Sequence, residues 1–255
     1  MKNIWIIAKK DLSSFFSSPV FYSLTSVFLI LNGFIFFNIL NYFSLQSFQV
    51  QQRPGSSFGL NLNEMVIEPS FHNMAVILLL IIPLVTMRSF AEEKKSKTFA
   101  LLLSSPIHLK EIIIGKFLSC MIVIGLMVLL SAYSTGYLIV VGDPEIGPIL
   151  TGYLGIFLIT GCYVSMGLFA SSLTDNQIIA AVISFGLALF MWIIGWGAQA
   201  GGSGLSQLLE YLSLITHLEH FLKGLINSSD LIYYLSFITF GLFLTHRVLE
   251  SSRWR

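Results

Sequence analysis

Charged side chains are scarce in this sequence. Asp, Glu, Lys and Arg make up 11% of its 255 residues, less than half of the roughly 25% found in soluble domains. The net charge at neutral pH is only +1, which argues against a nucleic-acid partner. Hydrophobic residues supply 55% of the chain and the mean hydropathy is +0.81. The composition therefore excludes an ordinary soluble protein and predicts one that crosses a membrane.

Two chemical signatures are also missing. The only cysteines, Cys120 and Cys162, both lie in apolar runs, where the usual role is that of a small buried residue rather than a metal ligand or redox pair. The phosphate-binding motif Gly-x-x-x-x-Gly-Lys-Ser/Thr does not occur, because Phe117 follows Gly115-Lys116 where Ser or Thr is needed. We therefore expect no nucleotide to bind through such a loop in this chain.

Six apolar runs are near or above the length that crosses a bilayer. A helix of about 20 residues spans roughly 30 Å of hydrocarbon. The runs are Val20–Leu40, Phe71–Met87, Phe117–Val141, Ile149–Leu173, Ile178–Ala198 and Leu231–Thr245. Pro83 predicts a kink in the second run. The first run is too long for a cleavable signal sequence, so we expect it to stay in the membrane. The sequence predicts an all-α integral membrane protein with six transmembrane helices, a single domain over residues 1–255.

The six runs contain no Asp, Glu, Lys or Arg, and His72, at the edge of the second, is their one histidine. Proton-coupled transporters need ionisable groups at membrane depth, and intramembrane proteases need paired carboxylates or zinc-binding histidines. A channel needs polar positions along a pore. We therefore expect a non-catalytic membrane part that changes shape, with no metal and no cofactor of its own.

The first 18 residues read as an amphipathic helix at the membrane surface. Apolar side chains recur at helical spacing from Ile4 to Phe15, and Lys9 and Lys10 are on the polar side, where anionic headgroups attract them. Pro19 then turns the chain into the first span. An alternative is a frayed polar tail.

Lys and Arg fall almost entirely on one side of the membrane in this arrangement. Three lie near the N-terminus, six between the second and third runs and three at the C-terminus, against only Arg53 and Lys223 on the other side. Because cytoplasmic segments are enriched in Lys and Arg, both termini are predicted to be cytoplasmic.

The six central cations lie in one stretch, residues 88–116, which also contains three glutamates. So many charges in an apolar chain predict a segment in water on the cytoplasmic side. We expect a partner to bind it there. The alternative is an ordinary charged loop that only fixes the topology.

The stretch from residue 199 to 230 is predicted to be on the extracytoplasmic side and to form short helices that lie on the outer leaflet or dip into it. Within it we interpret His217, Glu219, His220 and Lys223 as the polar side of an amphipathic segment. A metal site that includes Glu210 is the weaker alternative, because histidines three residues apart are common outside metal sites.

Three regions of the chain carry a resemblance to a known family: the central stretch, the N-terminal segment and the segments on either side of residue 225. The sequences RSFAEEK from Arg88, LLLSSPI from Leu101 and GK at Gly115 resemble the cytoplasmic signature of ABC-type-2 exporter permeases. The segment from Lys10 to Pro19 resembles the interfacial elbow helix of that family. Residues 217–224 and 230–236 are similar to the subgroup of gliding-motility-associated ABC permeases.

The resemblance implies the transmembrane permease subunit of an ABC exporter in a bacterial inner membrane. Two such subunits, identical or similar, would pair around a central path, and each would rest on a separate ATPase subunit that binds ATP and Mg. The segment between spans two and three would be a short coupling helix. The resemblance places its ATPase contacts at Glu92, Glu93, Lys94, Lys95 and Lys97, with Phe99, Leu102 and Leu103 packing behind them, and its elbow at Lys9, Lys10, Phe15 and Pro19.

This chain departs from the family at one point and leaves two functions open. Where the family usually has Gly-Thr-x-Glu, it has Lys97-Thr98-Phe99-Ala100. The first function is export of an amphiphilic substrate, which apolar, uncharged spans favour. The second is a non-transport subunit that transmits ATPase-driven motion to an envelope partner, which the long outer stretch favours.

Overall fold

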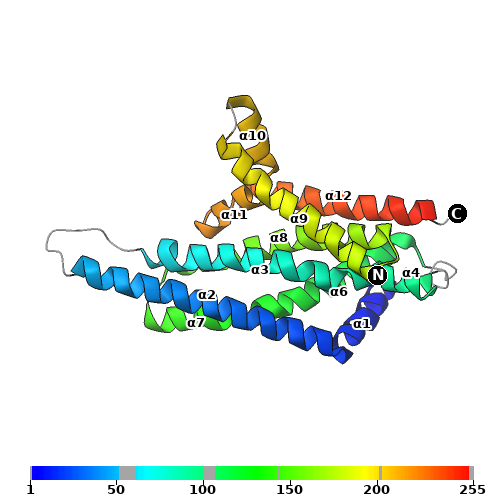
Figure 1. Cartoon of the computed structure of the whole chain (residues 1–255), viewed down its shortest axis with the longest axis horizontal. Helices are drawn as coiled ribbons and strands as arrows, with labels where there is room; N and C mark the ends of the chain where they lie inside the picture. Colours follow the sequence, from blue (N-terminus) through cyan, green and yellow to red (C-terminus); the bar gives the residue numbers. More distant parts are fainter. Residues whose placement is uncertain (1, 52–60, 100–106, 143, 201–202, 253–255) are drawn as a thin grey trace.

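The computed structural model describes residues 2–51, 61–99, 107–142, 144–200 and 203–252, and in these ranges the regular structure is entirely helical. Figure 1 shows long, roughly parallel helices with a shorter helix crossing one end. In chain order the helices are α1 (Lys2–Ser17), α2 (Pro19–Gln51), η1 (Asn63–Ile67), α3 (Glu68–Thr86), α4 (Arg88–Lys95), α6 (Leu109–Leu130), α7 (Ala132–Val141), α8 (Ile146–Leu173), α9 (Gln177–Ala200), α10 (Ser203–Leu212), α11 (Leu214–Leu222) and α12 (Ser228–Ser252).

The prediction of six membrane-spanning helices in an all-α protein is confirmed. Six helices in the described part of the chain are long and apolar enough to cross a membrane. Their bounds are Pro19–Val50, Asn63–Lys95, Leu109–Val141, Ile146–Leu173, Gln177–Gly195 and Ser228–Ser251. The protein is therefore a multi-pass integral membrane protein.

Several predicted boundaries were wrong, because helices extend past the apolar runs. The helix that contains the first run continues past Leu40 to Gln51, and the helical segment that contains the second run begins at Asn63, before Phe71. The second span, predicted to end at Met87, reaches Lys95 through α4. Polar residues at a helix end keep the backbone hydrogen bonds of the helix while their side chains reach water, so hydropathy alone ends a span too early.

Two breaks divide the long segments. α3 continues three residues beyond the internal Pro83, and Met87 separates it from α4. The third predicted span is divided at Ser131, whose hydroxyl bonds the carbonyl oxygen of Val128 at 2.6 Å. Such a bond from a side chain to the preceding turn competes with the backbone pattern and commonly bends a helix.

α8 is the central helix of the bundle and packs against α3, α4, α6, α9, α11 and α12. Small residues allow this close packing. A Cβ added at Gly167 would lie 2.1 Å from the Thr86 hydroxyl on α3, and one at Gly155 would lie 2.8 Å from Phe221 on α11. By contrast, α2, α9 and α12 leave most of their apolar surface exposed. Exposed apolar helix faces of this size fit lipid or another membrane subunit.

Both termini lie at one end of the bundle, together with α1 and α4 (Figure 1). We call this the lysine-rich end. α10 and the last part of α9 project away from the long helices, and α11 lies back against α8 (Figure 1). The expectation of short helices between the fifth and sixth spans is therefore met by α10 and α11.

Candidate functional site

The junction between α3 and α4 is held by one serine of the central helix. The Ser171 hydroxyl accepts hydrogen bonds from the backbone N–H groups of Phe90 and Ala91, each at 3.0 Å, and donates to the carbonyl of Met87 at 3.0 Å. The side chains of Phe90 and Ala91 are fully buried. A single hydroxyl thus satisfies the backbone groups that the break between the helices would leave unpaired.

A buried ion cluster joins three helices at the same end. Lys116 on α6 is 3% exposed and places its Nζ 2.9 Å from Glu93 of α4 and 3.3 Å from Asp11 of α1. Lys10 adds a longer contact to Glu93 at 3.6 Å. Lys116 was expected in water as part of the central stretch, and that expectation was wrong. Two carboxylates compensate its charge, which makes burial of the lysine tolerable.

The N-terminal helix α1 packs closely on α6. A Cβ at Gly115 would lie 3.0 Å from the carbonyl oxygen of Ile4, so a larger residue there would push the two helices apart by a few tenths of an ångström. Asn3 donates to Glu111 at 3.1 Å, and the side chains of Ile7 and Ala8 are buried. α1 ends at Ser17 and α2 begins at Pro19, where a proline at the first helical position loses no hydrogen bond.

A residue with a left-handed backbone follows the end of α4. Lys97 has φ of +58°, a conformation that side chains disfavour and glycine adopts freely. This is the position where the family resemblance places a glycine. The N–H of Lys97 bonds the carbonyl of Lys94 at 3.1 Å, and Ser96 bonds back to Glu92 at 2.9 Å. The turn thus has its usual backbone geometry with an unusual residue.

The predicted ATPase-contact residues that the structure describes fall into three groups, which are exposed, turned toward the bundle and buried. Glu92, Lys95 and Lys97 are exposed. Glu93 and Lys94 are turned toward the bundle, where Glu93 pairs with Lys116 and the Lys94 ammonium donates to the carbonyl of Ser172. Phe99 is buried, with its ring edge-on to Phe90 at 6.4 Å. Leu102 and Leu103 lie outside the described residues.

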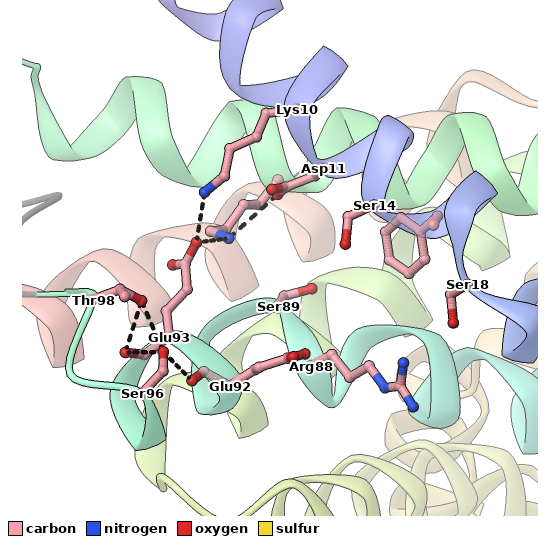
Figure 2. Close-up of a pocket in the computed structure, with 12 residues that line it drawn as sticks. Lys10, Asp11, Ser14, Ser18, Arg88, Ser89, Glu92, Glu93, Ser96 and Thr98 are labelled. Atoms are coloured by element: carbon pink, nitrogen blue, oxygen red, sulfur yellow. Dashed lines mark hydrogen bonds and ion pairs between the residues drawn. The ribbon is translucent and has the colours of Figure 1, made fainter.

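A polar cavity of about 270 Å³ separates α1 from α4. Figure 2 shows Ser14 of α1 and Ser18, between α1 and α2, facing Arg88 and Ser89 across it. The remaining lining residues are Lys10, Asp11, Phe15, Glu92, Glu93, Ser96, Thr98 and Lys116. Of the predicted elbow residues, Lys10 and Phe15 thus line the cavity, whereas Lys9 and Pro19 are exposed.

A second cluster lies at the N-terminus of α12, between α11 and α12. The carboxylate of Asp230, which is 2% exposed, meets His217 Nδ1 at 2.6 Å and His220 Nδ1 at 2.9 Å. His217 Nε2 lies 3.0 Å from the carbonyl oxygen of Tyr211, and its ring stacks on Tyr233 with centroids 4.0 Å apart. Both ring nitrogens of His217 thus lie within hydrogen-bond distance of an oxygen atom.

The interpretation of the outer motif as one polar face was wrong at His217. Its side chain is buried, while Glu219 and Lys223 are exposed and His220 is half-buried. The partner that draws His217 inward, Asp230, lies on the next helix and cannot be identified from the spacing of the motif. Among the described residues, no group of three or more His, Cys, Asp or Glu could hold a metal ion.

The comparison with known families agrees with this arrangement. The family model described as ABC-2 family transporter protein matches residues 5–245. The chain belongs to the ABC-2 transporter family. No curated protein matches the chain. The match extends from α1 into α12 and so includes the elbow, the ion cluster and the outer cluster of this ABC-2 protein.

Three residues that fix the lysine-rich end were not predicted as site residues. In the sequence, Asp11 and Lys116 occur only within the longer motifs given above, and Ser171 lies in an apolar run. The charge of Lys116 beside the third apolar run was a usable signal, since a lysine so close to a span needs a counter-ion if it is buried. Nothing in the sequence distinguishes Ser171 from the other serines of the spans.

Proposed function

We propose that this ABC-2 protein is the permease subunit of an ABC exporter and that its lysine-rich end receives the motion of a separate ATPase subunit. The family supports a membrane subunit that works with an ABC ATPase and pairs with a second permease. Export and coupling at α4 belong to the proposal. ATP and Mg would be bound by the ATPase, and this chain would take no part in hydrolysis.

The observation that supports this proposal is the attachment of α4 to the bundle. Its start is bonded to α8 through Ser171, and Glu93 in its last turn is paired with Lys116 of α6 and, through that lysine, linked to Asp11 of α1. A free cytoplasmic loop would absorb a push from a partner. A helix that is fixed in this way would pass the push to the spans as rigid-body movement.

The exposed charges at the end of α4 are the best candidates for the ATPase contact. Lys95 and Lys97 are exposed and do not line the cavity, whereas Glu92 is exposed and is one of its lining residues. Glu93 and Lys94 have partners inside the permease. We therefore assign them to holding the helix and assign Lys95 and Lys97 to the partner.

Co-purification of the ATPase tests the proposal directly. The variant carries Lys95→Gln and Lys97→Gly, which removes two charges while glycine suits the left-handed backbone of residue 97. We expect an ABC ATPase, identified by its phosphate-binding motif, to co-purify with the native chain from detergent-solubilised membranes and to be strongly reduced with the variant.

A matched control carries Lys9→Gln and Arg247→Gln, which removes two exposed charges near the same end without touching α4. It should retain the ATPase. Equal recovery with both variants would contradict the assignment of Lys95 and Lys97, and absence of any ATPase with the native chain would contradict coupling to such a partner.

The outer side favours a second candidate function. α10 projects from the bundle (Figure 1) and exposes Leu208, Tyr211 and Leu212. An exposed apolar patch of this kind suits contact with lipid or an envelope protein. In this alternative the subunit transmits ATPase-driven motion to that protein without transport. The two functions differ in the paired subunits: transport of an amphiphile needs a path along their interface, whereas transmission of motion allows a closed interface.

A further inference from the structure

Arg88, a cation in the cavity of the lysine-rich end, has no counter-ion among the described residues. Arg88 is half-buried at the start of α4, and its Nε is buried without a hydrogen-bond partner. No ion pair joins its guanidinium to another described residue, although Lys10 and Lys116 in the same cavity both have carboxylate partners. An arginine with its donors unmet at the edge of a membrane is well suited to a phosphate, which it can bind with two parallel hydrogen bonds.

The charges that line the cavity sum to zero, but one cation and one carboxylate take no part in its ion pairs. Its lining contains three cations and three carboxylates. Lys10, Lys116, Asp11 and Glu93 are engaged with one another, so Arg88 and Glu92 remain. They are four residues apart on one helix, where Cβ atoms lie roughly 5–6 Å apart. A ligand that carries an anionic and a cationic group a few ångströms apart fits this pair. A purely anionic ligand would be repelled by the carboxylate of Glu92.

Hydroxyl groups and an apolar cleft complete the site. Ser14, Ser18 and Ser89 line the cavity beside Arg88 and offer donors to phosphate oxygens. The cavity is far larger than the roughly 10–15 Å³ that one water needs. A narrow apolar cleft shares Phe15, Ser18 and Arg88 with it and continues between α2, α3 and α6, lined by Phe21, Leu24, Leu84, Val85 and Met127. With a volume of about 20 Å³ the cleft is too narrow to hold an acyl chain, but it marks the direction from the cavity toward the hydrocarbon.

We propose that this cavity binds the phosphoethanolamine headgroup of a phospholipid from the adjacent leaflet. Its phosphate pairs with Arg88 and the serine hydroxyls, its ammonium pairs with Glu92, and its acyl chains leave the cavity toward the hydrocarbon on the side of the apolar cleft. The lipid connects α1 to α4 within the cavity that the Lys116 cluster also lines. This site depends on the geometry of the chain alone and does not rest on the proposed coupling to an ATPase.

Lipid binding to the purified full-length chain tests the site. After removal of endogenous lipid, phosphatidylethanolamine, phosphatidylcholine and phosphatidylglycerol are added separately and bound lipid is counted by native mass spectrometry. We expect phosphatidylethanolamine to bind best. Arg88→Gln should weaken its binding at least about ten-fold, as for the loss of one charge-assisted hydrogen bond. Glu92→Gln should remove the preference over phosphatidylcholine, whose quaternary ammonium donates no hydrogen bond.

Two further variants separate this site from general effects of charge. Ser14→Phe fills the cavity without changing its charge and should also weaken binding. Arg247→Gln removes an exposed arginine of α12 that already has Glu250 as partner, and binding should be unchanged. Each variant is accepted only if its unfolding temperature is within a few degrees of the native value, and Arg88→Lys replaces Arg88→Gln if it is not, since an ammonium lacks the two-pronged geometry.

Three results would overturn the proposal. The first is equal binding of the three lipids to the native chain. The second is an equal loss with Arg247→Gln and Arg88→Gln. The third is displacement of the lipid by soluble glycerophosphoethanolamine at the same concentration, which would identify a solute rather than a membrane lipid as the ligand. Recovery of the ATPase is measured in parallel, so failure of the lipid site and failure of coupling remain distinguishable.

Discussion

Lys116 is the residue on which the packing of the lysine-rich end most depends. Its ammonium is buried between the carboxylates of Asp11 and Glu93, which come from two other helices. We expect Lys116→Gln to lower the free energy of unfolding by about 3 kcal/mol, because removal of one partner leaves the carboxylates buried without compensation. Thermal unfolding in detergent measures the loss. Lys110→Gln, on an exposed position of the same helix, is the control.

A compensating variant separates charge from packing. The triple variant Asp11→Asn, Glu93→Gln and Lys116→Gln keeps the shapes of the side chains and removes all three charges. Neutral groups of similar size can replace a buried ion cluster at little cost, so we expect the triple variant to be more stable than Lys116→Gln alone. If the two were equally unstable, the charges of the cluster would not explain its effect.

Residue roles were the hardest part to predict from the sequence. The charges of residues 88–116 were recognised, but their directions depend on partners distant in the chain: Glu93 faces Lys116, and Lys94 faces Ser172. The inward turn of His217 likewise depends on Asp230. One-dimensional spacing gives the face of a single helix and cannot give the neighbour that the face meets.

At the level of elements, the contact of α8 with α11 depends on a small residue. A Cβ at Gly155 would lie 2.8 Å from both Leu218 Cδ1 and Phe221 Cβ of α11. We expect Gly155→Ala to lower the free energy of unfolding by about 1–3 kcal/mol, the usual cost of overpacking. Gly186→Ala in α9 is the matched control, since a Cβ there meets nothing within 4 Å. Alanine at that position should leave stability unchanged or raise it by up to about 1 kcal/mol.

Unfolding midpoints of the two glycine variants in the same detergent decide this prediction. A fall with Gly155→Ala alone supports close packing of α11 on α8. Equal midpoints would mean that α11 moves aside without loss, in which case it is only loosely attached to the spans.

The existence and order of the helices were predictable, because runs of about 20 apolar residues have few alternatives. Their ends were not, since backbone hydrogen bonding continues α2 and α3–α4 into polar sequence.

At the level of the whole molecule, the distribution of charge predicts the orientation in the membrane. The six spans place both termini on one side, and the bias of Lys and Arg predicts that this side is cytoplasmic. The structure offers a clean test, because the native Cys120 and Cys162 are both buried and should react slowly with thiol reagents. New cysteines then report the two sides of the membrane. One replaces the exposed Lys95 in α4, and the other replaces the exposed Ser229 at the N-terminal end of α12.

We expect a membrane-impermeant maleimide to label Ser229→Cys in intact cells and to label Lys95→Cys only after the membrane is opened. Ser251→Cys, exposed near the C-terminal end of α12, should follow Lys95→Cys, because one span separates it from Ser229. The reverse pattern would invert the protein and place α4 beyond the reach of a cytoplasmic ATPase. Labelling of Lys95→Cys and Ser251→Cys from opposite sides would contradict the order of the spans between them.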